Sequence, residues 1–198
     1  MGRLTGVLGG TFDPPHIGHL ILAEIATDTL NLDRVLFVPA GDPPHKAAQT
    51  SIVHRVAMVE AAIRDNAHFA LSRVDTERPG PHYSVDMLRL LRQKLRGREL
   101  FFLIGGDSLH DLPTWHDPAG LIVQARLGVL RRPDATFDLA ELEAQIPGLE
   151  RQITFIDGPM ISISATLLRT RAQKGLSLRY LVPDAVAAYI TAQKLYAK

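Results

Sequence analysis

Two histidines near the N-terminus stand three residues apart, shortly after an apolar run that ends in two glycines. The segment reads Gly9-Gly10-Thr11-Phe12-Asp13-Pro14-Pro15-His16-Ile17-Gly18-His19. In the first turn of a helix, residues three apart share a face, so both imidazoles can point at one ligand. The helix start would add free backbone N–H groups and the positive end of its dipole, which together favour phosphate. Imidazole N–H groups there could stabilise charge as it shifts during a reaction.

Other interpretations of this segment make different demands on the chain. Gly9 and Gly10 are compatible with a simple turn that binds nothing. Two histidines at this spacing can bind a metal, but the chain has no cysteine and no acidic cluster lies nearby. The glycine spacing does not match a dinucleotide fingerprint, and no acidic residue ends the second apolar run to hold a ribose. A Walker loop is absent because the chain has no Gly-Lys dipeptide. Nucleotide binding of another kind remains.

Polar and basic residues also follow the later apolar runs. They are the loop 41–46, the pair Tyr83-Ser84, the segment Gly105-Gly106-Asp107, the loop around Trp115, the pair Arg131-Arg132 and the segment 163–169. Asp107 could accept hydrogen bonds from ribose hydroxyls. Arg169 offers a forked donor for pyrophosphate oxygens. These residue types suit a phosphorylated nucleoside.

Three of the candidates also have a purely structural interpretation. Ser84 is expected to be a helix N-cap in any case. Trp115, the only tryptophan, is a core residue by the statistics of its type, but its Pro-Thr-Trp-His loop favours a flat contact surface instead. Arg55 either adds positive charge near the site or lies on ordinary surface.

Apolar runs alternate with amphipathic segments along the chain, and this alternation predicts the fold. Expected strands are 4–8, 35–38, 69–71, 100–104, 127–130 and 153–156. Helices are expected to begin at Ser51 and Ser84, and a last one to have Pro183 at its first position. We expect one α/β domain over residues 1–198, a doubly wound parallel sheet covered by helices on both faces, with a C-terminal helical portion from about residue 164. Ligands of such sheets bind beyond the carboxyl ends of the strands.

The composition limits the partners. With 198 residues, 46% of them hydrophobic and 22% charged, the chain fits an ordinary globular protein. A formal charge of +1 gives no general attraction to nucleic acid or to acidic membranes, so neither is expected as a partner. The absence of cysteine excludes a disulfide framework, a zinc ribbon and thiol catalysis. The sequence shows no signal peptide and no apolar stretch near the roughly 18 residues of a membrane span, which predicts a cytoplasmic protein.

The segment 9–19 closely resembles the signature of the HIGH nucleotidyltransferase superfamily, in the form of its pyridine-nucleotide adenylyltransferase branch. Pro43-Pro44-His45-Lys46 resembles a segment of the bacterial nicotinate mononucleotide enzymes. Residues 163–169 resemble the second signature, usually Ser-Ser-Thr-x-x-Arg, with Ala165 in place of the middle serine. That change removes one hydroxyl and keeps the backbone N–H. The resemblance extends over residues 9–196, including the last amphipathic helix.

The resemblance implies a Rossmann-like nucleotidyltransferase fold and transfer of the adenylyl group of ATP to nicotinate mononucleotide, giving nicotinate adenine dinucleotide and pyrophosphate in NAD biosynthesis. It assigns the handling of phosphate charge to His16, His19, Lys46 and Arg169. It assigns ATP contacts to Gly9, Gly10, Thr11, Phe12, Gly105, Asp107, Ser164 and Thr166. It assigns mononucleotide contacts to His45, Tyr83, Ser84, Trp115 and Arg132, with Trp115 stacked on the pyridine ring and the helix start at Ser84 facing its carboxylate.

For such a reaction the protein needs no nucleophile, and its work is positioning and charge neutralisation. ATP and nicotinate mononucleotide are the expected partners, and homo-oligomerisation stays open. Mg²⁺ is expected to enter with ATP, held largely by phosphate oxygens and water, without a metal site of the protein.

Three alternatives remain beside this interpretation. A phosphopantetheine adenylyltransferase resembles the chain at the first signature, but not at the Pro-Pro-His-Lys run or the Trp115 loop. A class I aminoacyl-tRNA synthetase shares the His16 to His19 pattern, yet 198 residues leave no room for tRNA-binding domains. A nucleotide-sensing module without turnover would have a broken signature, whereas His16, His19, Thr166 and Arg169 are all present.

Overall fold

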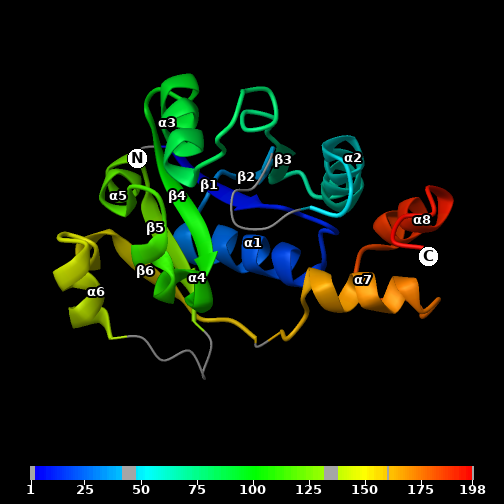
Figure 1. Ribbon diagram of the computed structural model, residues 1–198. Coiled ribbons are helices and arrows are strands. Elements are labelled where there is room, and N and C mark those ends of the chain that lie inside the picture. The colour runs from blue at the N-terminus through cyan, green and yellow to red at the C-terminus, as the bar shows by residue number, and fades with distance from the viewer. Residues whose placement is uncertain (1–2, 42–47, 132–137, 160, 198) are drawn as a thin grey trace.

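A computed structural model describes residues 3–41, 48–131, 138–159 and 161–197 of the protein. Within them six strands form one parallel sheet, in the order β3-β2-β1-β4-β5-β6 (Figure 1). The strands are β1 (Arg3–Gly10), β2 (Arg34–Pro39), β3 (Phe69–Leu71), β4 (Arg98–Gly105), β5 (Arg126–Leu130) and β6 (Ile153–Ile156). The order reverses between β1 and β4, as in doubly wound sheets. The predicted fold class is confirmed, and each predicted strand is found to within two residues at either end.

Helices connect these strands and cover both faces of the sheet. They are α1 (Ile17–Leu30), α2 (Ile52–Ile63), α3 (Ser84–Lys94), α4 (Gly106–His110), α5 (Pro118–Gln124), α6 (Leu139–Gln145), α7 (Ala165–Gln173) and α8 (Asp184–Ala192), with two short 3₁₀ turns, η1 (Leu112–Thr114) and η2 (Glu150–Gln152). No helix among the described residues is long and apolar enough to cross a membrane.

Alternate residues of the central strands point to opposite faces of the sheet. On β4, Phe102 and Ile104 belong to a core that includes residues of α3, α4 and α5. Phe101 and Leu103 belong to a second core, formed with residues of α1 and α2. Because both faces are buried, the strands read as continuous apolar runs rather than as an alternating pattern.

A third, smaller core holds the C-terminal helices against α2. Met58 of α2, Leu168 of α7 and Val186 of α8 are fully buried in it. Figure 1 shows α7 and α8 beside α2, at the end of the molecule opposite α6. This packing brings residues from the end of the chain to the start of α1, where the backbone N–H of Ile17 donates to the carbonyl of Leu181 over 3.1 Å.

Several local expectations were wrong by a residue or two. Gly9 and Gly10 do not form the turn, because the pairing of β1 with β2 continues through both of them. Tyr83, with extended backbone, is the N-cap of α3, and Ser84 is the first helical residue. Pro183 likewise lies just before α8 rather than at its first position. Ser51 is the N-cap of α2, as expected.

Candidate active site

A cavity of about 800 Å³ opens at the carboxyl ends of β1 and β4, where the strand order reverses. Most of the sequence-predicted site residues line it: Gly9, Gly10, Thr11, Phe12, His16, His19, Tyr83, Ser84, Gly105, Asp107, Trp115, Ser164 and Arg169. His45, Lys46 and Arg132 lie outside the described residues. The candidate site residues that follow separate strands in the sequence therefore meet in one cavity.

His16 and His19 form a stacked pair at the start of α1. His16 is the N-cap and His19 the third helical residue, and their ring centroids are 3.7 Å apart with planes inclined by 25°. The backbone N–H of His16 donates to Nδ1 of His19 over 3.1 Å. A neutral imidazole has one donor and one acceptor nitrogen. The proton of His19 therefore resides on Nε2, where it is available to a ligand.

Both imidazoles are neutral at pH 7 in the ligand-free protein. Burial lowers the pKa of His16 from 6.5 to about 4. Burial, with a smaller contribution from neighbouring His16, also holds the pKa of His19 well below 6.5. The pair thus offers neutral N–H donors rather than positive charge. Among the described residues that line the cavity, the permanent cation is Arg169.

The start of α1 offers fewer free N–H groups than the sequence suggested. The N–H of Ile17 is taken by Leu181, and that of His19 donates to the carbonyl of His16 over 2.9 Å. The C-terminal segment that packs on the helix start could not be foreseen from the local sequence. A phosphate bound here depends more on side-chain donors than expected.

The second signature lies on the opposite wall, at the start of α7. Ser164 is the N-cap of α7, and its Oγ accepts from the N–H of Leu167 over 3.2 Å. Arg169 donates from Nη1 to the carbonyl of Asp13 over 2.8 Å and from Nη2 to Oγ1 of Thr166 over 3.1 Å. Thr166 is not part of the cavity wall, so it orients Arg169 rather than facing a ligand. Within the described residues, Nε of Arg169 has no partner.

Asp13, which lines the cavity, ties three distant parts of the chain together. Its Oδ2 accepts from the N–H groups of Gln49 and Thr50 over 2.7 and 3.3 Å. Its Oδ1 accepts from Oγ1 of Thr50 over 2.5 Å and from the hydroxyl of Tyr196 over 2.6 Å. Burial by itself would raise the pKa of Asp13, but these bonds hold it below the ordinary 3.8. The carboxylate is therefore ionised and fully used by donors.

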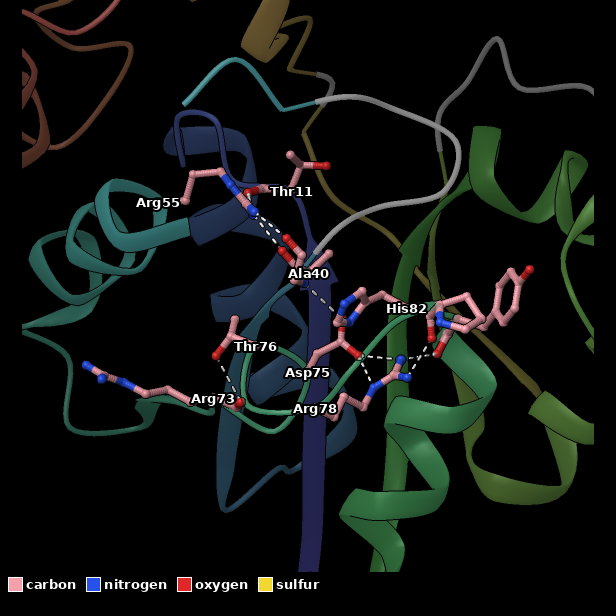
Figure 2. Close-up of polar contacts among 11 residues, drawn as sticks. Thr11, Ala40, Arg55, Arg73, Asp75, Thr76, Arg78 and His82 are labelled. Atoms are coloured by element: carbon pink, nitrogen blue, oxygen red, sulfur yellow. Dashed lines mark hydrogen bonds and ion pairs between the residues drawn. The ribbon is translucent and has the colours of Figure 1, made fainter. Parts of the chain in front are cut away.

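Arg55 is buried, so the expectation of an ordinary surface residue was wrong. It is 2% exposed. Its Nη1 donates to the carbonyls of Thr11 and Ala40 over 2.9 and 2.7 Å, and its Nη2 to that of Gly41 over 2.7 Å. Figure 2 shows the guanidinium reaching between the segments that follow β1 and β2. Arg55 thus joins the segments that follow β1 and β2, where Thr11 and Ala40 line the cavity.

The other end of the cavity is aromatic. Tyr83 stacks on His116, with ring centroids 4.0 Å apart and planes inclined by 22°. Trp115 is partly buried and lies edge-on to Phe102 at 6.2 Å. Both sequence-based interpretations of Trp115 therefore hold, because it packs on the core and also lines the cavity.

Two other residues differ from their expected places. The side chain of Phe12 is 2% exposed and packs against the rings of His19 and Phe37, so a ligand would meet mainly its backbone. Arg131 lies over the ring of Phe155, 4.4 Å from its centroid, and is not part of the cavity wall. The basic pair after β5 therefore does not bring Arg131 to the site.

Asp75 and His82 line the cavity but were missed in the sequence. They belong to an irregular stretch rich in proline and glycine, where no periodicity places a side chain. A charged residue within such a stretch was the one available signal. Asp13 belongs to the first signature, but the sequence did not reveal its hydrogen-bond partners, which lie 36, 37 and 183 residues away along the chain.

Comparison with known proteins identifies the family. Residues 7–171 match the cytidylyltransferase-like family model. A protein of Thermomicrobium roseum named nicotinate-nucleotide adenylyltransferase is 49% identical, covering 99% of this chain and 92% of its own. A Roseiflexus protein of the same name is 44% identical, with 96% of each chain covered. The chain belongs to the nicotinate-nucleotide adenylyltransferase family.

Solved structures of enzymes with a similar name have the same fold as this chain. Nicotinic acid mononucleotide adenylyltransferase of Plasmodium falciparum, complexed with NaAD, superposes with a TM-score of 0.80 at 17% identity, covering 98% of this chain and 97% of that one. The same enzyme complexed with APC gives a TM-score of 0.78. At this identity the likeness concerns the nucleotidyltransferase fold, which is shared over nearly the whole chain.

The low pKa of His16 predicts a pH dependence of stability. The folded state protonates His16 near pH 4, and the unfolded chain near 6.5. Between these values the unfolded chain binds more protons, so the free energy of unfolding rises with pH. This contribution is complete above pH 6.5 and lost as the pH falls toward 4, on the order of 3 kcal/mol. Urea titrations across this range measure it.

The variant His16→Asn keeps a residue type that caps helices well and should reduce this slope, while His19, whose pKa is also lowered, still contributes to it. His68 is exposed just before β3, and His68→Asn is the matched control for the loss of an imidazole elsewhere in the protein. Asp13 does not contribute to the slope between pH 4 and 6.5. Its pKa is lowered, so the stability that it provides is lost only below about pH 3.8. A slope in His16→Asn equal to that of the wild type would contradict the assignment.

The Asp13 cluster predicts that the last turn of the chain matters for stability. Tyr196→Phe removes a buried donor to a carboxylate, which should lower the free energy of unfolding by about 1–3 kcal/mol. Tyr189→Phe is the control, since its hydroxyl contacts Nδ1 of His54 over 3.0 Å at a partly exposed position of α8. Equal losses in the two variants would argue against a special role of the Asp13 contact.

Proposed function

We propose that the protein transfers the adenylyl group of ATP to the phosphate of nicotinate mononucleotide. The observation that carries this proposal is the convergence of His16, His19 and Arg169 on one end of a cavity whose other end is aromatic. The relatives that share most of the chain bear the name of this activity. A phosphate oxygen of the mononucleotide attacks the α-phosphorus of ATP. The bond from that phosphorus to the β-phosphate bridging oxygen breaks, and pyrophosphate leaves.

At the phosphate end, we assign His19 to the transferring group. Its Nε2–H is the free donor, since Nδ1 is already bonded to the backbone of His16. A donor held in place before the reaction stabilises developing charge without reorganising. Arg169 supplies positive charge, and its orientation is set by Asp13 and Thr166. The further proposed ATP contacts that line the cavity are Gly9, Gly10, Thr11, Gly105, Asp107 and Ser164.

At the aromatic end, we assign Trp115, Tyr83 and Ser84 to the pyridine mononucleotide. Trp115 offers a flat ring to the pyridine. The start of α3 has no side-chain cap, so its backbone N–H groups and the positive end of its dipole are available to a carboxylate. The aromatic wall also suits a pyridine better than the flexible aliphatic acceptor of a phosphopantetheine enzyme.

We propose that Mg²⁺ enters with the triphosphate. Among the described residues no group of three histidine, aspartate or glutamate side chains could hold a metal ion. The oxygens of Asp13 are used by protein donors and those of Asp75 pair with Arg78. Phosphate oxygens and water would thus provide most of the ligands. The ion would offset charge on the leaving pyrophosphate.

Replacing His19 tests the proposed chemistry. His19→Ala should lower kcat by on the order of a hundredfold or more, because a preorganised donor to the transferring group is lost. The control His68→Ala removes an exposed imidazole just before the edge strand β3, outside the cavity wall, and should keep the wild-type rate. A folded His19→Ala protein with unchanged kcat would mean that His19 does not act on the transferring group.

The choice of acceptor tests the substrate assignment. Pyrophosphate release from ATP is measured with nicotinate mononucleotide, nicotinamide mononucleotide and phosphopantetheine. The acid should exceed the amide in kcat/KM by roughly ten- to several-hundredfold. The amide loses a charge-assisted hydrogen bond, and its NH₂ group faces backbone N–H groups that are also donors. Phosphopantetheine should give no turnover. Equal kcat/KM for acid and amide, or turnover of phosphopantetheine alone, would contradict the assignment.

A further inference from the structure

The segment between β3 and α3 is held by one buried ion pair. Asp75 is 4% exposed, and its Oδ1 lies 2.8 Å from Nε and 2.7 Å from Nη2 of Arg78. Arg78 also donates from Nη1 to the carbonyl of Pro81 over 2.6 Å and from Nη2 to that of Tyr83 over 3.4 Å. Figure 2 shows these contacts converging on one guanidinium. Arg78 therefore connects the start of the segment to the residue that precedes α3.

The same carboxylate also reaches the neighbouring loop. Oδ2 of Asp75 accepts from the N–H of Gly41 over 3.2 Å and lies 3.4 Å from Nδ1 of His82. The ring of His82 packs on the backbone of Gly41, because a Cβ there would lie 2.4 Å from Cε1 of the histidine. The side chain of His82 is 7% exposed, and both Asp75 and His82 line the cavity. The segment is thus clamped from two sides.

The start of α3 depends on this clamp for its direction. No side chain caps the helix, so its first N–H groups are not fixed by a local partner. Tyr83, the N-cap, is held through its carbonyl by Arg78 and through its ring by His116. Small shifts of a donor set cost binding energy, because hydrogen bonds weaken steeply with poor geometry.

We propose that Arg78 is a positioning residue that sets the affinity for the pyridine mononucleotide and the preference for acid over amide, by holding the start of α3. This rests on the proposed function, in which that helix start binds the carboxylate. Arg78 is not part of the cavity wall, so it acts through the backbone of Pro81 and Tyr83. Its planar fork serves a carboxylate and two carbonyls together, which the single ammonium of lysine cannot do.

The first variant is Arg78→Lys, which keeps the charge opposite Asp75. Its matched control is Arg73→Lys, the same change in the same segment. Arg73 is half exposed, pairs with Glu60 and extends away from Asp75 in Figure 2. Steady-state assays with each mononucleotide give KM for the acceptor, KM for ATP, and kcat. Thermal unfolding monitors the fold.

We expect Arg78→Lys to raise KM for nicotinate mononucleotide roughly tenfold and to reduce the ratio of kcat/KM for acid over amide by a similar factor, as the loss of about one hydrogen bond to the carboxylate implies. KM for ATP should stay within about twofold. Arg73→Lys should match the wild type. An unchanged acceptor KM, or equal increases of both KM values, would overturn the proposal.

A second variant covers the case in which Arg78→Lys does not fold. Asp75→Asn with Arg78→Met removes both charges, so no unpaired charge stays buried. The asparagine oxygen can still accept from Gly41, but the donors to Pro81 and Tyr83 are gone. This variant should show the same shift in acceptor KM, and a wild-type value would overturn the proposal. Failure of the wild-type protein itself to use nicotinate mononucleotide would instead contradict the proposed function.

Discussion

Burying an ionised carboxylate is unfavourable unless donors replace the lost water, and the active-site loop is built around one such group. Asp13 is 2% exposed and receives hydrogen bonds from Gln49, Thr50 and Tyr196. Its carbonyl in turn receives Arg169. One residue of the first signature thereby determines where the start of α2, the end of the chain and the second signature lie.

Two other buried charged groups also hold loops around the cavity by bonding to several backbone groups at once. Arg55 satisfies three carbonyls of two loops. The pair of Asp75 and Arg78 satisfies a further group of one of these loops and two carbonyls of the segment before α3. Loops at strand ends have few backbone partners of their own, so buried charged side chains provide them. The cavity is thus shaped in large part by charged side chains whose hydrogen-bonding groups are used by the protein itself.

The described residues around His16 and His19 suit the proposed binding of two phosphorylated substrates. Burial disfavours the charged forms of His16 and His19, and neighbouring His16 adds to this effect on His19. In the proposed reaction, neutral donors together with Arg169, among the described residues, would stabilise charge on the transferring phosphate without binding pyrophosphate so tightly that it cannot leave. The arrangement agrees with a reaction in which positioning contributes more than covalent chemistry.

The strands, the doubly wound order and the family could be predicted from the sequence, because buried parallel strands read as apolar runs and a signature such as residues 9–19 is local. The meeting of His16, Ser84, Trp115 and Arg169 also followed, since parallel strands end at one edge. Burial and distant partners could not be derived in this way. Whether Arg55 is exposed, how Asp13 is paired, and that the N–H of Ile17 is already used depend on contacts across the chain. Those contacts exist only once the helices have packed, so tertiary structure alone decides them.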